Sequence, residues 1–257
     1  SSVAFSVQSP ITFKAGAGPL TFAETVTTTD DDVTFQVSTN SSVVGLDLGA
    51  GGIIKNGSGK LSLSGVKSFT GDTTVNAGML ESVGTAMSSA VAVAAGATYE
   101  IDLVSATDTA TYSKIISGEG SFVKSGAGDL TFDQAHTYTG STKISGGKLK
   151  TSGSGSLGSS TALSVASGAT YEVGVDEEVG SITGSGSISL GANQLTAGGS
   201  GTDTTFGGVI SGTGGLMKTG SGTLTLSGAN TYTGTTNVSG GVLSVDGSLS
   251  DVTAVYV

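Results

Sequence analysis

The single histidine of the chain, His136, is its first candidate for acid–base or metal chemistry. An imidazole can serve either role because its ordinary pKa lies close to neutral pH. Metal sites and catalytic triads need several converging partners, however, and the sequence has no second His and no Cys. His136 aligns with Asn230 of a related segment and precedes the string Thr-Tyr-Thr-Gly. We therefore expect a solvated turn residue.

Two acidic runs, Asp30–Asp32 and Asp176–Glu178, raise the alternative of a calcium site. Carboxylates and loop carbonyls are the ligands that Ca²⁺ prefers. Calcium-binding loops alternate their ligands around a fixed glycine, and neither run has that spacing. We expect both runs to be solvated loop tips, and we expect no metal site.

A polysaccharide-acting enzyme is the catalytic alternative that the acidic residues raise. Glycoside hydrolases need two converging carboxylates, and lyases generally need a strong cation or metal beside the abstracted proton. Here the acids are scattered, the chain has no Arg and no Trp, and the serines lie in glycine-rich turns without a nucleophile elbow. The sequence predicts no enzyme, no catalytic, cofactor-binding or metal-binding residues, and no cofactor.

The composition favours an all-β protein. The 257 residues include 44 glycines but only two prolines, and the apolar residues are mainly Val, Leu and Ile. β-Branched residues suit a pleated surface, and glycines supply corners. The net charge is −10 and every basic residue is Lys, which argues against nucleic-acid binding. No apolar run is long enough for a membrane helix, so we expect no direct membrane insertion.

One motif repeats three times, over 55–84, 124–153 and 218–247, and the copies align without a gap. The shared frame is K-x-G-x-G-x-L-[ST]-[LF], then an aromatic residue before Thr-Gly, an aliphatic residue, glycine and a final Leu. A truncated copy opens at Lys14. Internal repetition of this kind is typical of a solenoid, in which each coil packs on its neighbours.

Within each motif, apolar and small polar residues alternate. A period of two places one face of a strand toward the core. We therefore expect Leu61, Leu130 and Leu224 to occupy equivalent internal positions. We interpret the successive spacings of the copies, from Lys14 through to Lys218, as two, three and four whole turns of a coil of roughly 20–24 residues.

Two further sets of residues recur. Lys55, Lys124 and Lys218 open the three copies, just before the glycine corners, and we expect exposed charges that discourage irregular strand pairing. Tyr99 and Tyr171 occur in two matching Gly-Ala-Thr-Tyr-Glu strings. We expect them to stack on the coil rather than to form an exposed adhesive surface.

The string GSGTLTLSGANTYTGTTNVSGGVLSV, residues 220–245, closely resembles the passenger-associated transport repeat of type V autotransporters. The second copy departs from that pattern at 133–136 and the first at 67–69. The resemblance implies a right-handed parallel β-helix, a surface or secreted location, and export coupled to a C-terminal outer-membrane barrel. It also implies repeats that support passenger folding during secretion, and it carries no catalytic residues.

The predicted fold class is therefore all-β, a right-handed parallel β-helix (solenoid) over 45–257, with a less regular β segment at 1–44 that supplies first coils or a cap. We expect a non-catalytic scaffold or stalk of an adhesin-type passenger at the bacterial cell surface. Its expected partners are host or neighbouring-cell surface molecules, or further copies of itself. The main alternative is a self-assembling extracellular filament or matrix subunit, with 252–257 as an exposed end strand.

Overall fold

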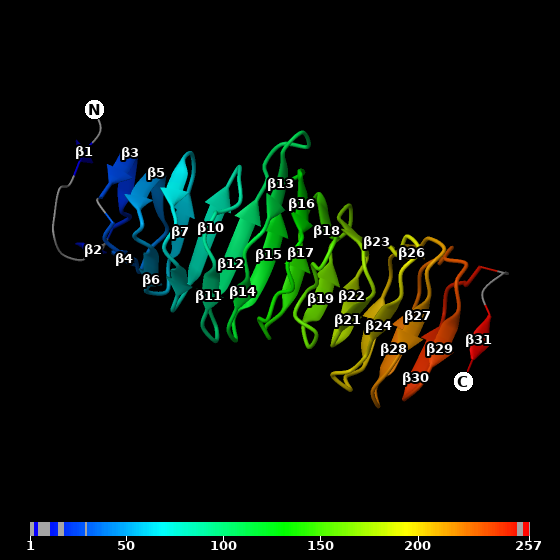
Figure 1. Cartoon of the computed structure of the whole chain (residues 1–257). Helices are drawn as coiled ribbons and strands as arrows, with labels where there is room; N and C mark the ends of the chain where they lie inside the picture. The colour runs from blue at the N-terminus through cyan, green and yellow to red at the C-terminus, as the bar shows by residue number, and fades with distance from the viewer. Residues whose placement is uncertain (1–2, 5–10, 15–17, 29, 251–253, 257) are drawn as a thin grey trace.

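The computed structural model of the protein describes every residue except 1–2, 5–10, 15–17, 29, 251–253 and 257. All regular elements within these described residues are β-strands. The strands stack in chain order along one axis, with the two termini at opposite ends (Figure 1). Across the same residues, no helix is long and apolar enough to cross a membrane.

Neighbouring strands pair in parallel and form four sheets. The 14-stranded sheet contains β1 (Val3–Ala4), β3 (Thr21–Thr27), β5 (Ser41–Gly49), β7 (Lys60–Leu63), β10 (Met79–Val83), β12 (Thr98–Asp102), β15 (Ser121–Ser125), β17 (Thr142–Ile144), β19 (Ala162–Val165), β22 (Ser181–Gly184), β25 (Thr204–Phe206), β28 (Thr223–Leu226) and β30 (Val242–Val245), with β8 (Lys67–Phe69) beside β5.

The other three sheets cover the remaining sides of the stack. The first six-stranded sheet contains β14 (Ile116–Ser117), β11 (Val91–Val93), β9 (Thr73–Val75), β6 (Ile53–Asn56), β4 (Val33–Gln36) and β2 (Ile11–Lys14). The second contains β13 (Thr109–Tyr112), β16 (Asp129–Phe132), β18 (Lys148–Thr151), β20 (Thr170–Glu172), β23 (Ser187–Ser189) and β26 (Val209–Ser211). The five-stranded sheet contains β21 (Glu177–Val179), β24 (Leu195–Ala197), β27 (Leu216–Lys218), β29 (Thr236–Val238) and β31 (Val255–Tyr256).

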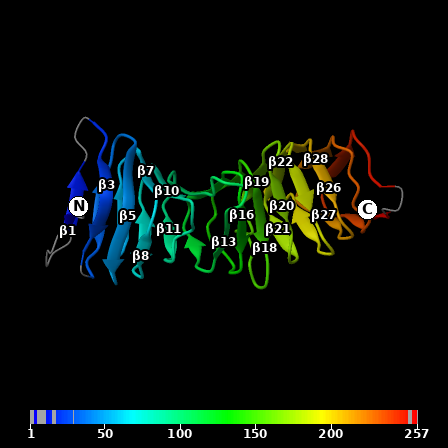
Figure 2. The ribbon, with the colours of Figure 1, turned by 90° about the horizontal axis from the view of Figure 1, so that it is seen from above.

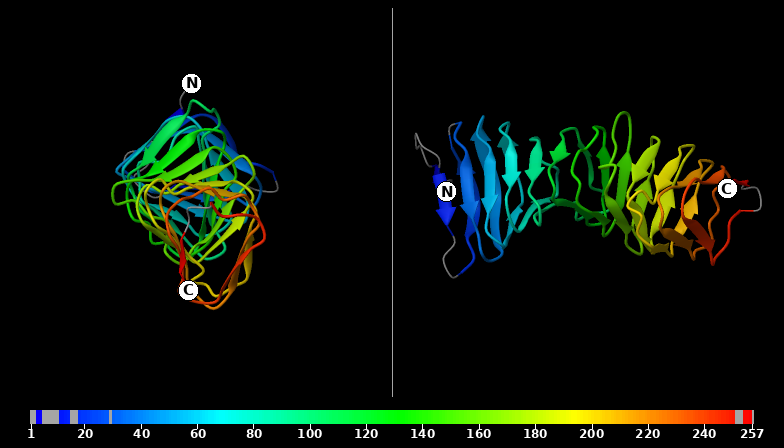
Figure 3. Two further views of the ribbon diagram at one scale, coloured as in Figure 1. Left: turned by 90° about the vertical axis from the view of Figure 1, so that its right-hand side faces the viewer. Right: turned by 90° about the horizontal axis from the view of Figure 1, so that it is seen from below.

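Hydrogen bonds join residues about 20 positions apart in successive coils. Parallel strands that return to the same sheet after one coil define a β-solenoid, which confirms the predicted fold class. The stack is not straight. Figure 2 shows the ribbon narrower around β11 and β13 than toward its ends, and the end-on view in Figure 3 shows the last coils displaced from the first.

Glycine is required at the corners because consecutive coils approach closely there. Gly57 has a φ of 80°, and a Cβ at that position would lie 2.2 Å from the carbonyl oxygen of Val37 in the preceding coil. Gly126 repeats this arrangement in the second copy, with a φ of 72° and the oxygen of Leu103 at 2.2 Å. Any side chain would clash with the backbone below, so the K-x-G corner cannot accept another residue.

The motif leucines point into the core, as predicted: Leu61, Leu130 and Leu224 are all buried. Each lies in register with the final Leu of its own copy, so that Leu61 faces Leu80 and Leu130 faces Leu149 on adjacent strands. Leu224 faces Leu243 in the same way, although Leu243, in the last full coil, is only partly buried.

The expected spacing by whole turns is wrong for the second copy. Leu61 and Leu224 lie in the 14-stranded sheet, whereas Leu130 lies on β16 of a six-stranded sheet. The coils between the first and third copies therefore bring the motif leucine back to the same sheet. The coils between the first and second copies do not add up to whole turns, so the strands of the second copy fall on a different side of the solenoid.

The described part of 1–44 contributes strands to the same sheets. β2 and β4 pair with each other, and β4 then pairs with β6, which follows residue 45. Residues 15–17 of the truncated copy at Lys14 lie outside the described residues. The division of the chain at 44/45 stays a prediction, which hydrogen exchange measured on both sides of residue 44 would test.

Candidate functional site

The three lysines that open the repeats lie buried beneath the glycine corners. Lys55 and Lys124 are 0% exposed and Lys218 is 1% exposed. Each is in register with the inward-facing aliphatic residue of the next coil, as Lys124 is with Ile144. The prediction of exposed charges is therefore wrong. The apolar stem of each lysine packs in the core, and the ammonium group reaches the corner from inside.

Each ammonium group donates three hydrogen bonds, which matches its three protons. The acceptors are the carbonyl oxygens of the next two residues and of the residue 22 positions later. The distances are 3.1, 2.8 and 2.9 Å from Lys55 Nζ to Asn56, Gly57 and Ala77, 2.6, 3.1 and 3.3 Å from Lys124 Nζ to Ser125, Gly126 and Gly146, and 2.6, 3.1 and 3.1 Å from Lys218 Nζ to Thr219, Gly220 and Gly240.

These contacts join the corner of one coil to the corner of the next. Burial lowers the pKa of Lys55 to about 8 and also lowers the pKa values of Lys124 and Lys218. The three carbonyl dipoles act in the opposite direction because they stabilise the charged form. With a pKa of about 8, the Lys55 amine is still largely charged at neutral pH. In each repeat the lysine joins two successive corners through its three hydrogen bonds. We call this contact the lysine clamp.

The motif position that holds His136 and Asn230 is also buried, with exposed fractions of 4% and 2%. The prediction of a solvated turn residue at His136 is therefore wrong. Its Nδ1 accepts a hydrogen bond from the backbone N–H of Ile116 at 3.0 Å. Its ring packs edge-on against that of Phe132, with 4.0 Å between the ring centroids. Burial lowers the pKa of His136 to about 4, so the ring is neutral at physiological pH.

Glu177 is another buried side chain that accepts a hydrogen bond from a backbone N–H. Its neighbours Asp176 and Glu178 are exposed, as predicted, but Glu177 itself is 4% exposed, so the expectation of a solvated loop tip is wrong there. Its Oε1 accepts from the N–H of Leu157 at 3.1 Å and its Oε2 from the hydroxyl of Tyr171 at 2.7 Å. Burial raises the pKa of the Glu177 carboxyl to about 7.

The first acidic run caps backbone groups of the following coil. Asp30 and Asp32 are exposed, as predicted, whereas Asp31 is half-buried. The Oδ1 atoms of Asp30 and Asp32 accept from the N–H groups of Ala50 at 2.8 Å and Gly52 at 2.7 Å. In the part of the chain that the structure describes, no three His, Cys, Asp or Glu side chains lie close enough together to hold a metal ion.

Buried tyrosines hold a second repeated contact. The hydroxyl of Tyr138 lies 2.5 Å from Thr142 Oγ1, and that of Tyr232 lies 2.6 Å from Thr236 Oγ1. The Tyr-x-x-x-Thr spacing in the sequence was the signal for this pair, and sequence reasoning missed it. Tyr99 and Tyr171 are fully buried, which confirms the prediction that they pack on the coil.

Comparison with known proteins identifies the repeat. The passenger-associated-transport-repeat family matches residues 53–81, 122–150 and 216–245. The chain is 35% identical over 198 residues, 76% of its length, to the Adhesin BmaC autotransporter of Brucella suis biovar 1 (strain 1330), of which it covers 5%. It is 63% identical over 41 residues, 16% of its length, to an extracellular serine protease of Serratia marcescens, of which it covers 4%. No solved structure matches.

Proposed function

Since the chain is an autotransporter passenger segment that carries three passenger-associated transport repeats, we propose that it is a non-catalytic scaffold of an adhesin-type passenger whose repeats support folding during secretion. The passenger would act outside the cell, secreted or displayed at its surface. Its expected partners are surface molecules of host or neighbouring cells, together with an outer-membrane barrel in the full-length protein.

One observation supports this proposal most directly: the two strands of each pair formed by a repeat both lie within that repeat. In the second repeat, β15 pairs with β17 and β16 pairs with β18, while the Lys124 clamp joins the two corners between them. The first and third repeats have the same pairs. A single repeat therefore contains both partners of each of these contacts within its own two-coil unit.

Local pairing of this kind suits a chain that emerges gradually from a membrane. The entropic cost of closing a loop grows with its length, and contacts between residues near in sequence form fastest. Each repeat can close as soon as its own residues have emerged. The coils between repeats then add to an existing template, because solenoid stability is a sum of coil and neighbour terms.

The test uses the full-length protein in its native export system. We would replace all three clamp lysines, Lys55, Lys124 and Lys218, by Met and measure protease-resistant passenger at the cell surface together with adhesion per displayed molecule. We expect less folded passenger and unchanged adhesion per molecule. A matched control replaces the exposed residue Lys143 by Met.

Normal surface display with lost adhesion would contradict the proposal, because it would make the lysines part of a binding site. Normal display with normal adhesion would also contradict it, because the clamps would then have no role in folding. The first result would indicate a ligand-binding module, and the second would remove the lysine clamps from the account of folding.

Self-association is the second candidate function, and an exposed apolar surface supports it. In the last described coils, Val242 is 54% exposed, Val255 51% and Tyr256 59%. Only residues 254–256 of the expected end strand 252–257 are described, and β31 within them pairs with β29. If copies stack end to end, sedimentation velocity should show concentration-dependent growth that Val242→Lys abolishes. A monomer at all concentrations would contradict stacking.

A further inference from the structure

The first repeat has Lys67 at the motif position that His136 and Asn230 occupy in the other two. Those two side chains accept a backbone N–H from the preceding coil. In the first repeat that task falls to the backbone, because the N–H of Leu46 donates to the carbonyl oxygen of Val66 at 2.8 Å and β8 pairs with β5. The Lys67 side chain therefore does not have to accept a backbone N–H, as the His136 and Asn230 side chains do. It extends instead toward the following coil.

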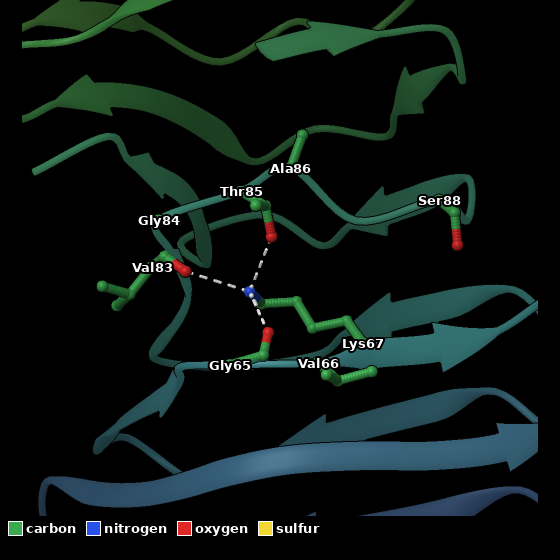
Figure 4. A pocket seen from close by; sticks show the side chains of 8 residues that line it. All are labelled: Gly65, Val66, Lys67, Val83, Gly84, Thr85, Ala86 and Ser88. Atoms are coloured by element: carbon green, nitrogen blue, oxygen red, sulfur yellow. Dashed lines mark hydrogen bonds between the residues drawn. The ribbon is translucent and has the colours of Figure 1, made fainter. Parts of the chain in front are cut away.

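The Lys67 side chain forms one wall of a surface cleft between β8 and the segment that follows β10 (Figure 4). The cleft has a volume of about 430 Å³, within the range of small-molecule sites. Val66 and Ala86 provide apolar lining, and the exposed residues Thr85 and Ser88 add polar lining. The Ser88 hydroxyl donates to the carbonyl oxygen of Phe69 at 3.1 Å. Val66 is 65% exposed, so this apolar wall is uncovered.

The charge in this cleft has no acidic partner. Lys67 Nζ donates to the carbonyl oxygens of Gly65 at 3.2 Å and Val83 at 3.0 Å, and to Thr85 Oγ1 at 3.1 Å. No carboxylate within the described residues forms an ion pair with it, whereas Lys60 and Lys150 each pair with a Glu. Burial lowers the pKa of Lys67 to about 8, which reflects a partly desolvated charge without a counter-ion.

We propose that this cleft binds a small organic monocarboxylate with a short apolar chain. The carboxylate would take the place of Thr85 Oγ1, the one side-chain acceptor of the three, and pair with the Lys67 ammonium group. The apolar chain would cover Val66 and Ala86. A single negative charge fits best, because the protein carries a net charge of −10 and the Gly65 and Val83 carbonyl oxygens would repel a second one.

The experiment titrates the isotopically labelled chain with hexanoate, hexanamide or inorganic phosphate and follows the backbone amides of Thr85 and Ala86 and the Lys67 side chain by NMR. We expect saturable shifts with hexanoate alone, and a higher Lys67 pKa in its presence. Equal shifts with hexanamide would overturn the role of the charge. Equal shifts with phosphate would overturn the role of the apolar chain, and no shift with any probe would overturn the site.

Two variants test the Lys67 charge and the apolar wall at Val66 separately. Lys67→Gln should weaken hexanoate binding by about tenfold or more, a loss of about 1.4 kcal/mol or more by the standard relation between affinity and free energy. The matched control Lys143→Gln, at an exposed lysine, should leave it unchanged. Val66→Ser should weaken hexanoate binding but not acetate binding. Retained affinity in Lys67→Gln, with an unchanged circular dichroism spectrum, would refute the proposal.

Discussion

His136 and Asn230 receive the same hydrogen bond in two different repeats. The N–H of Ile116 donates to His136 Nδ1 at 3.0 Å, and the N–H of Ile210 donates to Asn230 Oδ1 at 3.0 Å. Both donors lie 20 residues earlier, in the preceding coil. A neutral imidazole and a carboxamide are thus interchangeable as acceptors for a buried backbone group that would otherwise lack a partner.

The first prediction follows from this equivalence. His136→Asn keeps an acceptor for Ile116 N–H and should change the free energy of unfolding by less than about 1 kcal/mol, whereas His136→Leu removes the acceptor and should cost about 1–3 kcal/mol. Urea unfolding of the two variants would measure the difference. Equal losses would mean that the ring contributes through packing alone.

The second prediction concerns acid pH and His136. Its folded-state pKa of about 4 lies below the ordinary 6.5, so between these values the unfolded chain binds a proton that the folded chain does not. The stability from neutral His136 is full above pH 6.5 and falls as pH drops toward 4. Compared with the His136→Asn variant, the unsubstituted protein should lose about 2–3 kcal/mol of its free energy of unfolding between pH 7 and pH 4. A constant difference would contradict the burial of a neutral ring.

The third prediction concerns Glu177, whose contribution to stability changes with pH in the direction opposite to that of His136. Glu177 has a folded-state pKa of about 7, above its ordinary 4.5, so the folded chain retains a proton that the unfolded chain loses. Its contribution to stability is full below pH 4.5 and declines as pH rises toward 7. Glu177→Gln keeps an acceptor for Leu157 N–H, and its stability relative to the unsubstituted protein should rise by up to about 3 kcal/mol from pH 4.5 to pH 8. A fall over that range would be the contrary result.

The fourth prediction isolates one lysine clamp. Lys124→Met retains the apolar stem but leaves three corner carbonyls without their charged donor, and it should cost about 1–3 kcal/mol. Lys143→Met, on the exposed side of the neighbouring strand, should be neutral within about 0.5 kcal/mol. Thermal unfolding of both variants gives the comparison. A stabilised Lys124→Met would mean that desolvation of the ammonium group outweighs its hydrogen bonds.

The sequence was sufficient to predict the strands and the inward leucines, because a period of two within a repeat is a local pattern. The alignment of His136 with Asn230 was also correct. Their burial was not predictable, because their hydrogen-bond partners lie in another coil. The lysines were misjudged for a related reason: a charged residue beside glycines suggests a surface, and only the folded corner reveals converging carbonyl oxygens.

The sequence also could not predict on which side of the solenoid each repeat lies, for a different reason. The spacing between copies fixes it only if the length of every intervening coil is known. Met79 of β10 pairs with Thr98 of β12, and Thr98 pairs in turn with Ser121 of β15, so the second of these two coils is the longer one. Such differences accumulate and turn the second repeat onto another sheet.

The central claim is that each passenger repeat folds as a self-paired unit before the coils between repeats. Pulse-labelling hydrogen exchange during refolding tests it most directly, because it records when each backbone amide becomes protected. We predict that amides of β15 to β18 gain protection before those of β19 to β25, and that Lys124→Met removes this lead. Simultaneous protection of all coils, or earlier protection between the repeats, would contradict the account.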